Sequence, residues 1–286
     1  MTRSIVVTGC DAAHYDLATD LFTSLRDARG PAVTIGYIHI GEDSVPPVIE
    51  AAADHIVHVH DAQFLGDQRR GFRLAYLAVK PRLPELFPGY DVYIWLDGDT
   101  WVQNAAGLDQ LIHCAGLADV CMHPESDPNY FARLYPRQYM YDVYTSIYGA
   151  DDALRYAGHH ILNSGVFAAA AASPVWRLWR DALADMLERS RDRDDFFFSD
   201  QIPLHRLIVD GRISVHPLRA INNWLLYLSA PMVNLERRRL LAPSYPYEEI
   251  NILHLVSISK DARYRLGDSD REITFRYRDI KALFGG

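Results

Sequence analysis

Residues 90–104 read YDVYIWLDGDTWVQN, and this stretch decides the fold that we expect. Its first part, residues 90–96, is rich in large apolar side chains, which is typical of a buried strand in a parallel sheet. Asp97, Gly98 and Asp99 come next, so two carboxylates follow the carboxyl end of the strand. Ligands of open α/β sheets bind at that edge. The stretch therefore predicts a buried strand with a ligand site at its end.

The carboxylates of Asp97 and Asp99 favour a hard cation as that ligand. Both can reach one ion because the glycine between them lets the backbone turn tightly. Mg²⁺ and similar ions take carboxylate oxygens and leave other positions for substrate phosphates. The alternative is that both aspartates are ordinary turn and cap residues after a strand. The long apolar strand in front of them favours the cation site.

The segments before residues 90–96 alternate between strand and helix patterns. Parallel strands need crossover connections, so this alternation predicts a doubly wound, mostly parallel sheet. The expected strands are residues 4–7, 33–40 and 56–59, and the expected helices are near 17–25, 47–53 and 72–86, the last broken by Pro81 and Pro84.

The second half of the chain is less regular, and no linker rich in Gly, Pro or Ser divides it from the first. We therefore expect one domain over residues 1–286 with an elaborated C-terminal half. The expected strands are residues 118–122, 161–171 (containing a turn) and 252–256, and the expected helices are 175–189, 199–209 and 277–284.

Composition excludes several classes of protein. The chain has 286 residues, and 29 Lys+Arg against 37 Asp+Glu give a net charge of −8, which argues against a general nucleic-acid binder. No apolar run approaches the ~20 residues of a membrane span, and the apolar run near the N-terminus is too short for a secretory signal. The cysteines Cys10, Cys114 and Cys121 form no CxxC motif. A cytoplasmic location is therefore expected.

Two classes of enzyme place an Asp-x-Asp motif after a strand. In haloacid-dehalogenase-type phosphatases the first aspartate is a nucleophile, and Asp97 to Thr100 fit that string. Their motif follows the first strand of the domain, however, whereas three expected strands precede it here. Metal-dependent nucleotide-sugar glycosyltransferases carry the motif further along the chain. The position of the motif favours this second class.

The sequence resembles the retaining glycosyltransferases of family 8, the lipopolysaccharide galactosyltransferase and glycogenin type. The resemblance implies a GT-A fold, a Rossmann-like doubly wound and mostly parallel sheet. It implies a nucleotide-binding half over 1–110, a donor-sugar and acceptor half over 111–260, and a tail over 261–286. Five blocks carry it: residues 6–15 (VVTGCDAAHY), 75–88 (AYLAVKPRLPELFP), 97–99 (DGD), 163–166 (NSGV) with 200–201 (DQ), and 253–260 (LHLVSISK).

The resemblance implies a metal site and a set of donor contacts. Asp97, Asp99 and His254 would bind Mn²⁺ (or Mg²⁺), and Lys260 would offset diphosphate charge. Ser257 stands where the family usually has glycine, so a side chain occupies the space of a close backbone approach. The residues implied to bind the donor are Thr8, Gly9, Asp11, Tyr15, Lys80, Asp97, Gly98, Asp99, Asn163, Ser164, Gly165, His254 and Lys260.

Asp200 and Gln201 are the implied catalytic pair, with Asp200 on the sugar hydroxyls and Gln201 near the anomeric carbon. Each functional assignment has a plainer alternative. Asp200 and Gln201 fit a helix cap, residues 163–165 fit a turn, and His254 fits a core histidine. In the same way Asp11 fits an ordinary turn, Tyr15 fits the core face of the first helix, and Trp224 and residues 196–198 (FFF) fit the core better than a sugar platform.

The expected function is metal-dependent transfer of a hexose from a nucleotide sugar, most simply a UDP-sugar, with retention of configuration. The acceptor is expected to be a saccharide, a glycolipid or another hydroxyl compound that contacts residues 130–156. The residues near the C-terminus, 270–284, suit either weak contact with a membrane surface or a packed helix. The alternatives are a phosphatase with Asp97 as nucleophile and a non-catalytic nucleotide-sugar-binding protein.

Overall fold

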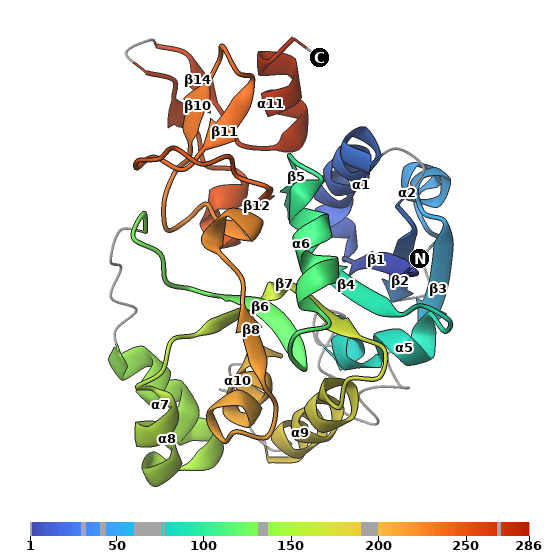
Figure 1. Ribbon diagram of the computed structural model, residues 1–286, viewed down its shortest axis with the longest axis vertical. Helices are drawn as coiled ribbons and strands as arrows, with labels where there is room; N and C mark the ends of the chain where they lie inside the picture. Colours follow the sequence, from blue (N-terminus) through green and yellow to red (C-terminus); the bar gives the residue numbers. More distant parts are fainter. Residues whose placement is uncertain are drawn as a thin grey trace.

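The computed structural model describes residues 2–29, 33–40, 44–59, 76, 78–130, 137–189, 200–267 and 270–285. A seven-stranded sheet is at its centre, and β7 is antiparallel to both neighbours while every other adjacent pair is parallel (Figure 1). The expectation of a mostly parallel sheet is thus confirmed. In spatial order the strands are β3 (His55–Val59), β2 (Ile35–Ile40), β1 (Ser4–Gly9), β4 (Val92–Leu96), β7 (Leu162–Ala170), β6 (Val120–Pro124) and β8 (Val215–Pro217).

Three smaller sheets accompany the central one. A three-stranded sheet consists of β5 (Thr100–Val102), β12 (Ile252–His254) and β9 (Trp224–Leu225). The two-stranded sheets are β10 (Met232–Asn234) with β11 (Arg239–Leu241), and β13 (Tyr264–Arg265) with β14 (Glu272–Ile273).

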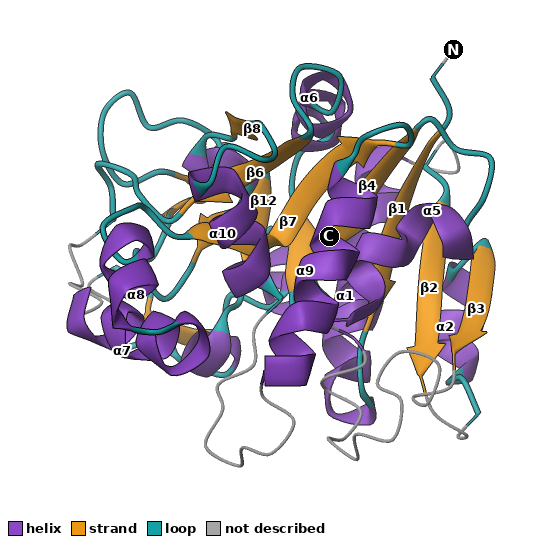
Figure 2. Cartoon of the chain, turned by 90° about the horizontal axis from the view of Figure 1, so that it is seen from below, coloured by secondary structure: helices purple, strands orange, loops and turns teal. Residues whose placement is uncertain are grey.

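Helices cover both faces of the central sheet, and Figure 2 shows β2 and β3 at one edge with α7 and α8 beyond the other. The α-helices are α1 (Tyr15–Arg29), α2 (Pro47–Ala52), α5 (Leu83–Leu86), α6 (Ala106–Cys114), α7 (Arg137–Tyr148), α8 (Ala150–Tyr156), α9 (Val175–Arg189), α10 (Gln201–Val209) and α11 (Tyr277–Leu283). The 3₁₀ helices are η1 (Ala12–His14), η3 (Lys80–Arg82), η4 (Ala220–Asn222) and η5 (Ser257–Lys260).

Alternation along the strands divides the core between the two faces. On β4, Tyr93 and Trp95 pack with α7, α9 and α10, while Ile94 and Leu96 pack with α1 and α6. A third apolar cluster, which includes Trp224, joins the three-stranded sheet to α11. Trp224 is therefore a core residue, as expected. Within the described ranges, no helix has the length and apolar composition that crossing a bilayer requires.

Most of the expected elements are present, with one correction. The turn expected within 161–171 is wrong, because β7 is a continuous strand whose pairing with β6 shifts register between Met122 and His123. In the helix expected over 72–86, the described residues 76, 78 and 79 are helical, and the prolines that follow coincide with the short η3 and α5. Residues 72–75 and 196–198 lie outside the described residues.

Candidate metal and nucleotide-sugar site

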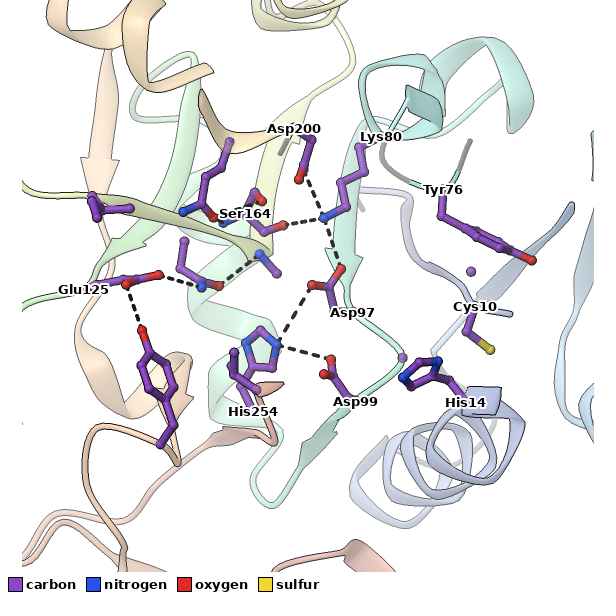
Figure 3. A pocket seen from close by; sticks show the side chains of 18 of the residues that line it. Cys10, His14, Tyr76, Lys80, Asp97, Asp99, Glu125, Ser164, Asp200 and His254 are labelled. Carbon is purple, nitrogen blue, oxygen red and sulfur yellow. Dashed lines mark hydrogen bonds and ion pairs between the residues drawn. The ribbon is translucent and has the colours of Figure 1, made fainter. Parts of the chain in front are cut away.

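A cavity of about 550 Å³ lies where the parallel strands β1, β4 and β6 end. Asp97 directly follows β4, and Glu125 directly follows β6, so carboxylates from two strands reach it (Figure 3). The described residues that line it are Gly9, Cys10, Asp11, His14, Tyr76, Lys80, Asp97, Gly98, Asp99, Glu125, Met140, Val143, Ile161, Asn163, Ser164, Gly165, Asp200, Gln201, Ile202, Tyr227, His254, Val256 and Lys260.

Asp97, Asp99 and His254 form a cluster in this cavity that suits a metal ion. One ligand atom from each lies within 4.8 Å of the others. The Nε2 atom of His254 is 3.2 Å from Oδ1 of Asp99 and 3.9 Å from Oδ2 of Asp97. Two carboxylates and one imidazole form a donor set that suits Mn²⁺. The residues present therefore fit the metal that the sequence implies.

Strand pairing explains how His254 reaches two aspartates far away in the sequence. β12 lies antiparallel to β5, and His254 pairs with Thr100, the residue after Asp99. The backbone N–H of Leu255 donates to the carbonyl of Asp99 at 2.8 Å, which holds the two segments together. His254 is therefore held in a sheet strand, while Asp97 and Asp99 lie in the short turn between β4 and β5.

A chain of hydrogen bonds orients the imidazole of His254. Its Nδ1 lies 3.0 Å from Oδ1 of Asn223, so Nδ1–H donates there and Nε2 faces the carboxylates. The amide of Asn223 donates to Asn163 at 3.0 Å, and the amide of Asn163 donates to Glu125 at 3.0 Å. Tyr227 donates to the other oxygen of Glu125. Burial raises the pKa of Glu125 against these two hydrogen bonds.

Lys80 forms a second charged cluster on the other side of Asp97. Its Nζ lies 3.1 Å from Oδ1 of Asp97, 3.1 Å from Oδ2 of Asp200 and 3.2 Å from the carbonyl oxygen of Ser164. The indole N–H of Trp95 also donates to Oδ1 of Asp97, at 2.6 Å. Burial opposes the charge of Lys80, but the carboxylates of Asp200 and Asp97 outweigh burial and raise its pKa. The lysine is thus an internal counter-ion.

Lys260 approaches the metal cluster from the C-terminal part of the chain. Its Nζ lies 3.0 Å from Oδ2 of Asp99 and 3.0 Å from Nε2 of His14. His14 in turn contacts Asp11 through Nδ1 at 2.5 Å. Burial opposes ionisation of Asp99, but His254 and Lys260 outweigh it and hold the pKa of that carboxyl below its usual range. Asp99 is thus a carboxylate at neutral pH.

Gly165 has to be glycine because His254 and Asp97 occupy the space of a side chain. A Cβ atom at this position would lie 2.2 Å from Cε1 of His254 and 2.8 Å from Oδ2 of Asp97. The backbone N–H of Asp97 also donates to the carbonyl of Gly165 at 2.7 Å. The backbone of β7 at Gly165 therefore packs directly against His254 and Asp97, with no room for a side chain.

Comparison with solved structures identifies the fold that carries this site. No protein-family model matches the chain, and no curated protein matches its sequence. The galactosyltransferase LgtC in complex with donor and acceptor sugar analogs matches with a TM-score of 0.60 and 14% identity, over 98% of this chain and 95% of LgtC. The chain has the GT-A fold.

Two further structures share the GT-A fold. The apo form of the glycosyltransferase GlyE of Streptococcus pneumoniae TIGR4 has a TM-score of 0.54 and 16% identity, over 100% of this chain and 61% of GlyE. The apo form of mouse xyloside xylosyltransferase 1 has a TM-score of 0.53 and 15% identity, over 88% of this chain and 97% of that enzyme. At these identities the likeness is one of fold, and the chemistry has to be argued from the site.

Within the GT-A fold, the structure brings most of the residues singled out from the sequence into one cavity. Thr8 and Tyr15 are the two that do not line it: Thr8 is buried in β1, and Tyr15 packs at the edge of the α1 core. Asp200 occupies the N-cap position of α10, but its side chain makes no capping hydrogen bond and pairs with Lys80. Residues 163–165 lie inside β7, so their alternative as a simple turn is wrong.

Sequence reasoning missed several residues of the cavity. Glu125 carries the same signal as Asp97, a carboxylate directly after a strand, and that rule would have found it. His14 and Asn223 carry no comparable signal, because their roles depend on Lys260 and His254. The other lining residues that were not singled out are Cys10, Tyr76, Ile161, Ile202, Tyr227 and Val256, while Met140 and Val143 fall within the segment 130–156 where acceptor contacts are expected.

Proposed function

We propose that the chain is a metal-dependent glycosyltransferase that moves a hexose from a nucleotide sugar, a UDP-sugar, to a hydroxyl acceptor with retention of configuration. One observation carries the proposal: Asp97, Asp99 and His254 come within 4.8 Å of one another at the carboxyl edge of a GT-A sheet. Lysines flank this cluster on both sides, which suits a ligand that brings both a cation and a diphosphate.

Asp97, Asp99 and the Nε2 atom of His254 would hold the ion, Mn²⁺ in preference to Mg²⁺ because an imidazole is among the ligands. When bound, a divalent ion stabilises negative charge on a leaving diphosphate. Asp97, Asp99 and Asp200 carry three negative charges, and among the described residues that pair with them Lys80 and Lys260 offset two. The cluster therefore keeps a net negative charge, which a bound cation would neutralise.

The two lysines have different roles in this proposal. Lys260 is partly exposed and reaches the cavity, so it can contribute a point charge to a diphosphate. Lys80 is almost fully buried and already has three oxygen partners. Lys80 would therefore position Asp97 and Asp200, and Asp200 would present its carboxylate toward the hydroxyls of the donor sugar.

Retention of configuration follows most simply from attack on the face that the leaving group occupies. The amide of Gln201 is a poor nucleophile, while Asp200 and Glu125 are held by Lys80 and by Asn163 with Tyr227. In the proposed step the acceptor oxygen bonds to the anomeric carbon and the bond to the diphosphate oxygen breaks. The acceptor proton passes to the departing diphosphate. A product with inverted anomeric configuration would contradict this step.

The decisive test measures UDP release from a panel of UDP-sugars with Mn²⁺ and with a chelator. We expect release for one donor class, loss of release in the chelator, and loss of most turnover in the folded variants Asp97→Asn, Asp99→Asn and His254→Ala. Asp109→Asn on α6, an exposed acidic residue outside the cavity, is the matched control and should keep full activity.

The same assay separates the alternatives. The phosphatase alternative is not favoured, because the matched structures are glycosyltransferases and Asp97 follows the fourth strand. Release of phosphate from simple phosphate esters in the absence of UDP would support the phosphatase alternative. UDP-sugar binding with neither transfer nor hydrolysis would support the non-catalytic alternative.

The acceptor, the location and the domain organisation stay proposals. Met140 and Val143 of α7 line the cavity, which supports contact between this part of the segment 130–156 and a saccharide, glycolipid or other hydroxyl acceptor; residues 131–136 lie outside the described residues. We retain a cytoplasmic location and one domain over 1–286 from the sequence. For residues 270–284 the sequence left open a membrane-surface contact or a packed helix. The helix α11 packs against α1, with Arg278 donating to Asp20, which agrees with the packed helix.

A further inference from the structure

A second cavity of about 310 Å³ lies between α1, β5, β11 and α11, elements that meet in the upper part of Figure 1. It shares no lining residue with the cavity at Asp97. Its volume is at the lower end of the range of small-molecule sites. The described residues that line it are Ser24, Asp27, Ala28, Trp101, Val102, Gln103, Arg238, Arg239, Tyr277, Ile280, Lys281 and Phe284.

One wall of the second cavity is aromatic and held in place. The rings of Trp101 and Tyr277 have their centroids 5.4 Å apart, and the indole N–H of Trp101 donates to the carbonyl of Phe275 at 2.8 Å. Ile280 and Phe284 continue this wall along α11. Such a surface favours a flat or compact apolar group.

The other lining residues carry an excess of positive charge, although the chain as a whole has a net charge of −8. Asp27 opposes three cations and is itself bound by Lys281 and by the hydroxyl of Tyr277. Burial opposes ionisation of Asp27, but these two contacts outweigh it and lower its pKa. Arg239 forms an ion pair with Glu249, with 3.7 Å between its Nε and Oε2 of the glutamate. Arg238 forms no side-chain hydrogen bond or ion pair with any described residue.

The backbone of Arg238 is also unusual. Its φ angle is +53°, in the left-handed region that non-glycine residues rarely adopt. Strained residues of this kind persist where the surroundings fix them, and they gather at ligand-binding positions. Arg238 is the last residue of the turn between β10 and β11, where hairpins commonly place a residue with positive φ, and its exposed side chain lines the cavity.

We propose that this cavity binds a small organic anion, a carboxylate or phosphate attached to an aromatic or compact apolar group. The guanidinium of Arg238 binds the anionic oxygens as a planar fork, and Tyr277 and Phe284 contact the apolar part. The excess of positive charge selects against neutral and cationic ligands. This site stands apart from the proposed glycosyl transfer and does not depend on it.

The test measures binding of phenyl phosphate and benzoate by calorimetry and ligand-observed NMR, with benzyl alcohol and inorganic phosphate for comparison. We expect saturable binding of at least one aromatic anion and much weaker binding of the two comparison compounds. Arg238→Asn keeps a residue that tolerates a positive φ and should weaken binding about tenfold. Ala28→Phe fills the cavity and should abolish binding.

The matched control is Arg237→Ala, which removes the same charge from the neighbouring position without touching the cavity. It should leave binding unchanged, and thermal unfolding verifies that each variant is folded. The proposal is overturned if neither aromatic anion binds the wild type saturably. It is also overturned if Arg237→Ala weakens binding as much as Arg238→Asn, or if folded Ala28→Phe binds like the wild type. Should Ala28→Phe fail to fold, Arg238→Asn against Arg237→Ala decides alone.

Discussion

The two sides of Asp97 show how one carboxylate can serve two charged clusters. Figure 3 shows Lys80 on one side of Asp97, at Oδ1, and His254 on the other side, at Oδ2, and the indole N–H of Trp95 also donates to Oδ1. On the lysine side, the side chains of Lys80 and Asp200 are each 3% exposed and their charges are balanced within the protein. On the metal side, Asp97 and Asp99 are 33% and 12% exposed and face an open cavity.

On the lysine side, the charges are balanced by the protein alone. On the metal side, a bound ligand would be needed to balance them. Breaking a buried ion pair leaves an uncompensated charge in a low-dielectric interior, which costs far more than losing an exposed pair. The lysine side should therefore govern stability, and the metal side should govern binding. Each prediction below tests that division.

The largest effect is expected for Lys80→Met, which leaves Asp97 and Asp200 without their shared cation. We expect a loss of roughly 3 to 5 kcal/mol in the free energy of unfolding, measured with urea. The control Arg177→Met breaks an exposed pair with Asp181 and should cost about 1 kcal/mol or less. Adding Asp200→Asn to Lys80→Met should recover part of the loss. Equal costs for Lys80→Met and Arg177→Met would remove the distinction between the two sides.

Gly165→Ala is expected to disturb both sides, because the new Cβ would collide with His254 and Asp97. Overpacking of this kind typically costs about 1 to 3 kcal/mol of stability. The rise in melting temperature on adding Mn²⁺ should disappear, as measured by thermal unfolding. Gly116→Ala, where the nearest atom to a Cβ is 3.7 Å away, is the control. An unchanged Mn²⁺ response in Gly165→Ala would show that the cluster holds no metal.

Asn223→Ala should affect the metal side alone, because it removes the acceptor that orients His254. Loss of such a partner typically lowers metal affinity by about 10- to 100-fold, and titration with Mn²⁺ would measure it. Asn223→Asp keeps the acceptor and should restore most of the affinity. The neighbouring Asn222 bonds to Gln110 and Asn251 instead, so Asn222→Ala should leave Mn²⁺ affinity unchanged. Equal losses in the two alanine variants would contradict an orienting role.

The smallest effect on stability is expected for Lys260→Met, the counterpart of Lys80→Met on the metal side. Lys260 is 24% exposed, so losing its pair with Asp99 should cost about 1 kcal/mol or less. Affinity for Mn²⁺ alone should be kept, since a competing cation is removed, while affinity for UDP with Mn²⁺ should fall. Calorimetric titration of both ligands measures this split. A parallel fall in both affinities would mean that Lys260 supports the metal ligands rather than the diphosphate.

Local patterns carried much of the fold and the centre of the site. Large apolar side chains in residues 90–96 predict β4, and the two carboxylates after it predict a ligand site at the sheet edge. The spacing of His254 to Lys260 came from resemblance, and both residues do reach Asp99. Such strands, turns and short motifs can be predicted because each depends on residues that are neighbours in the sequence.

The division of labour around Asp97 was decided only in three dimensions. Lys80 meets the carbonyl of Ser164, which is 84 positions away, and His254 depends on Asn223, which is 31 positions away. The second cavity brings α1 together with α11 from the far end of the chain. A sequence pattern reports the period and end of an element. It does not report which distant side chain balances a buried charge, because that depends on how the elements pack.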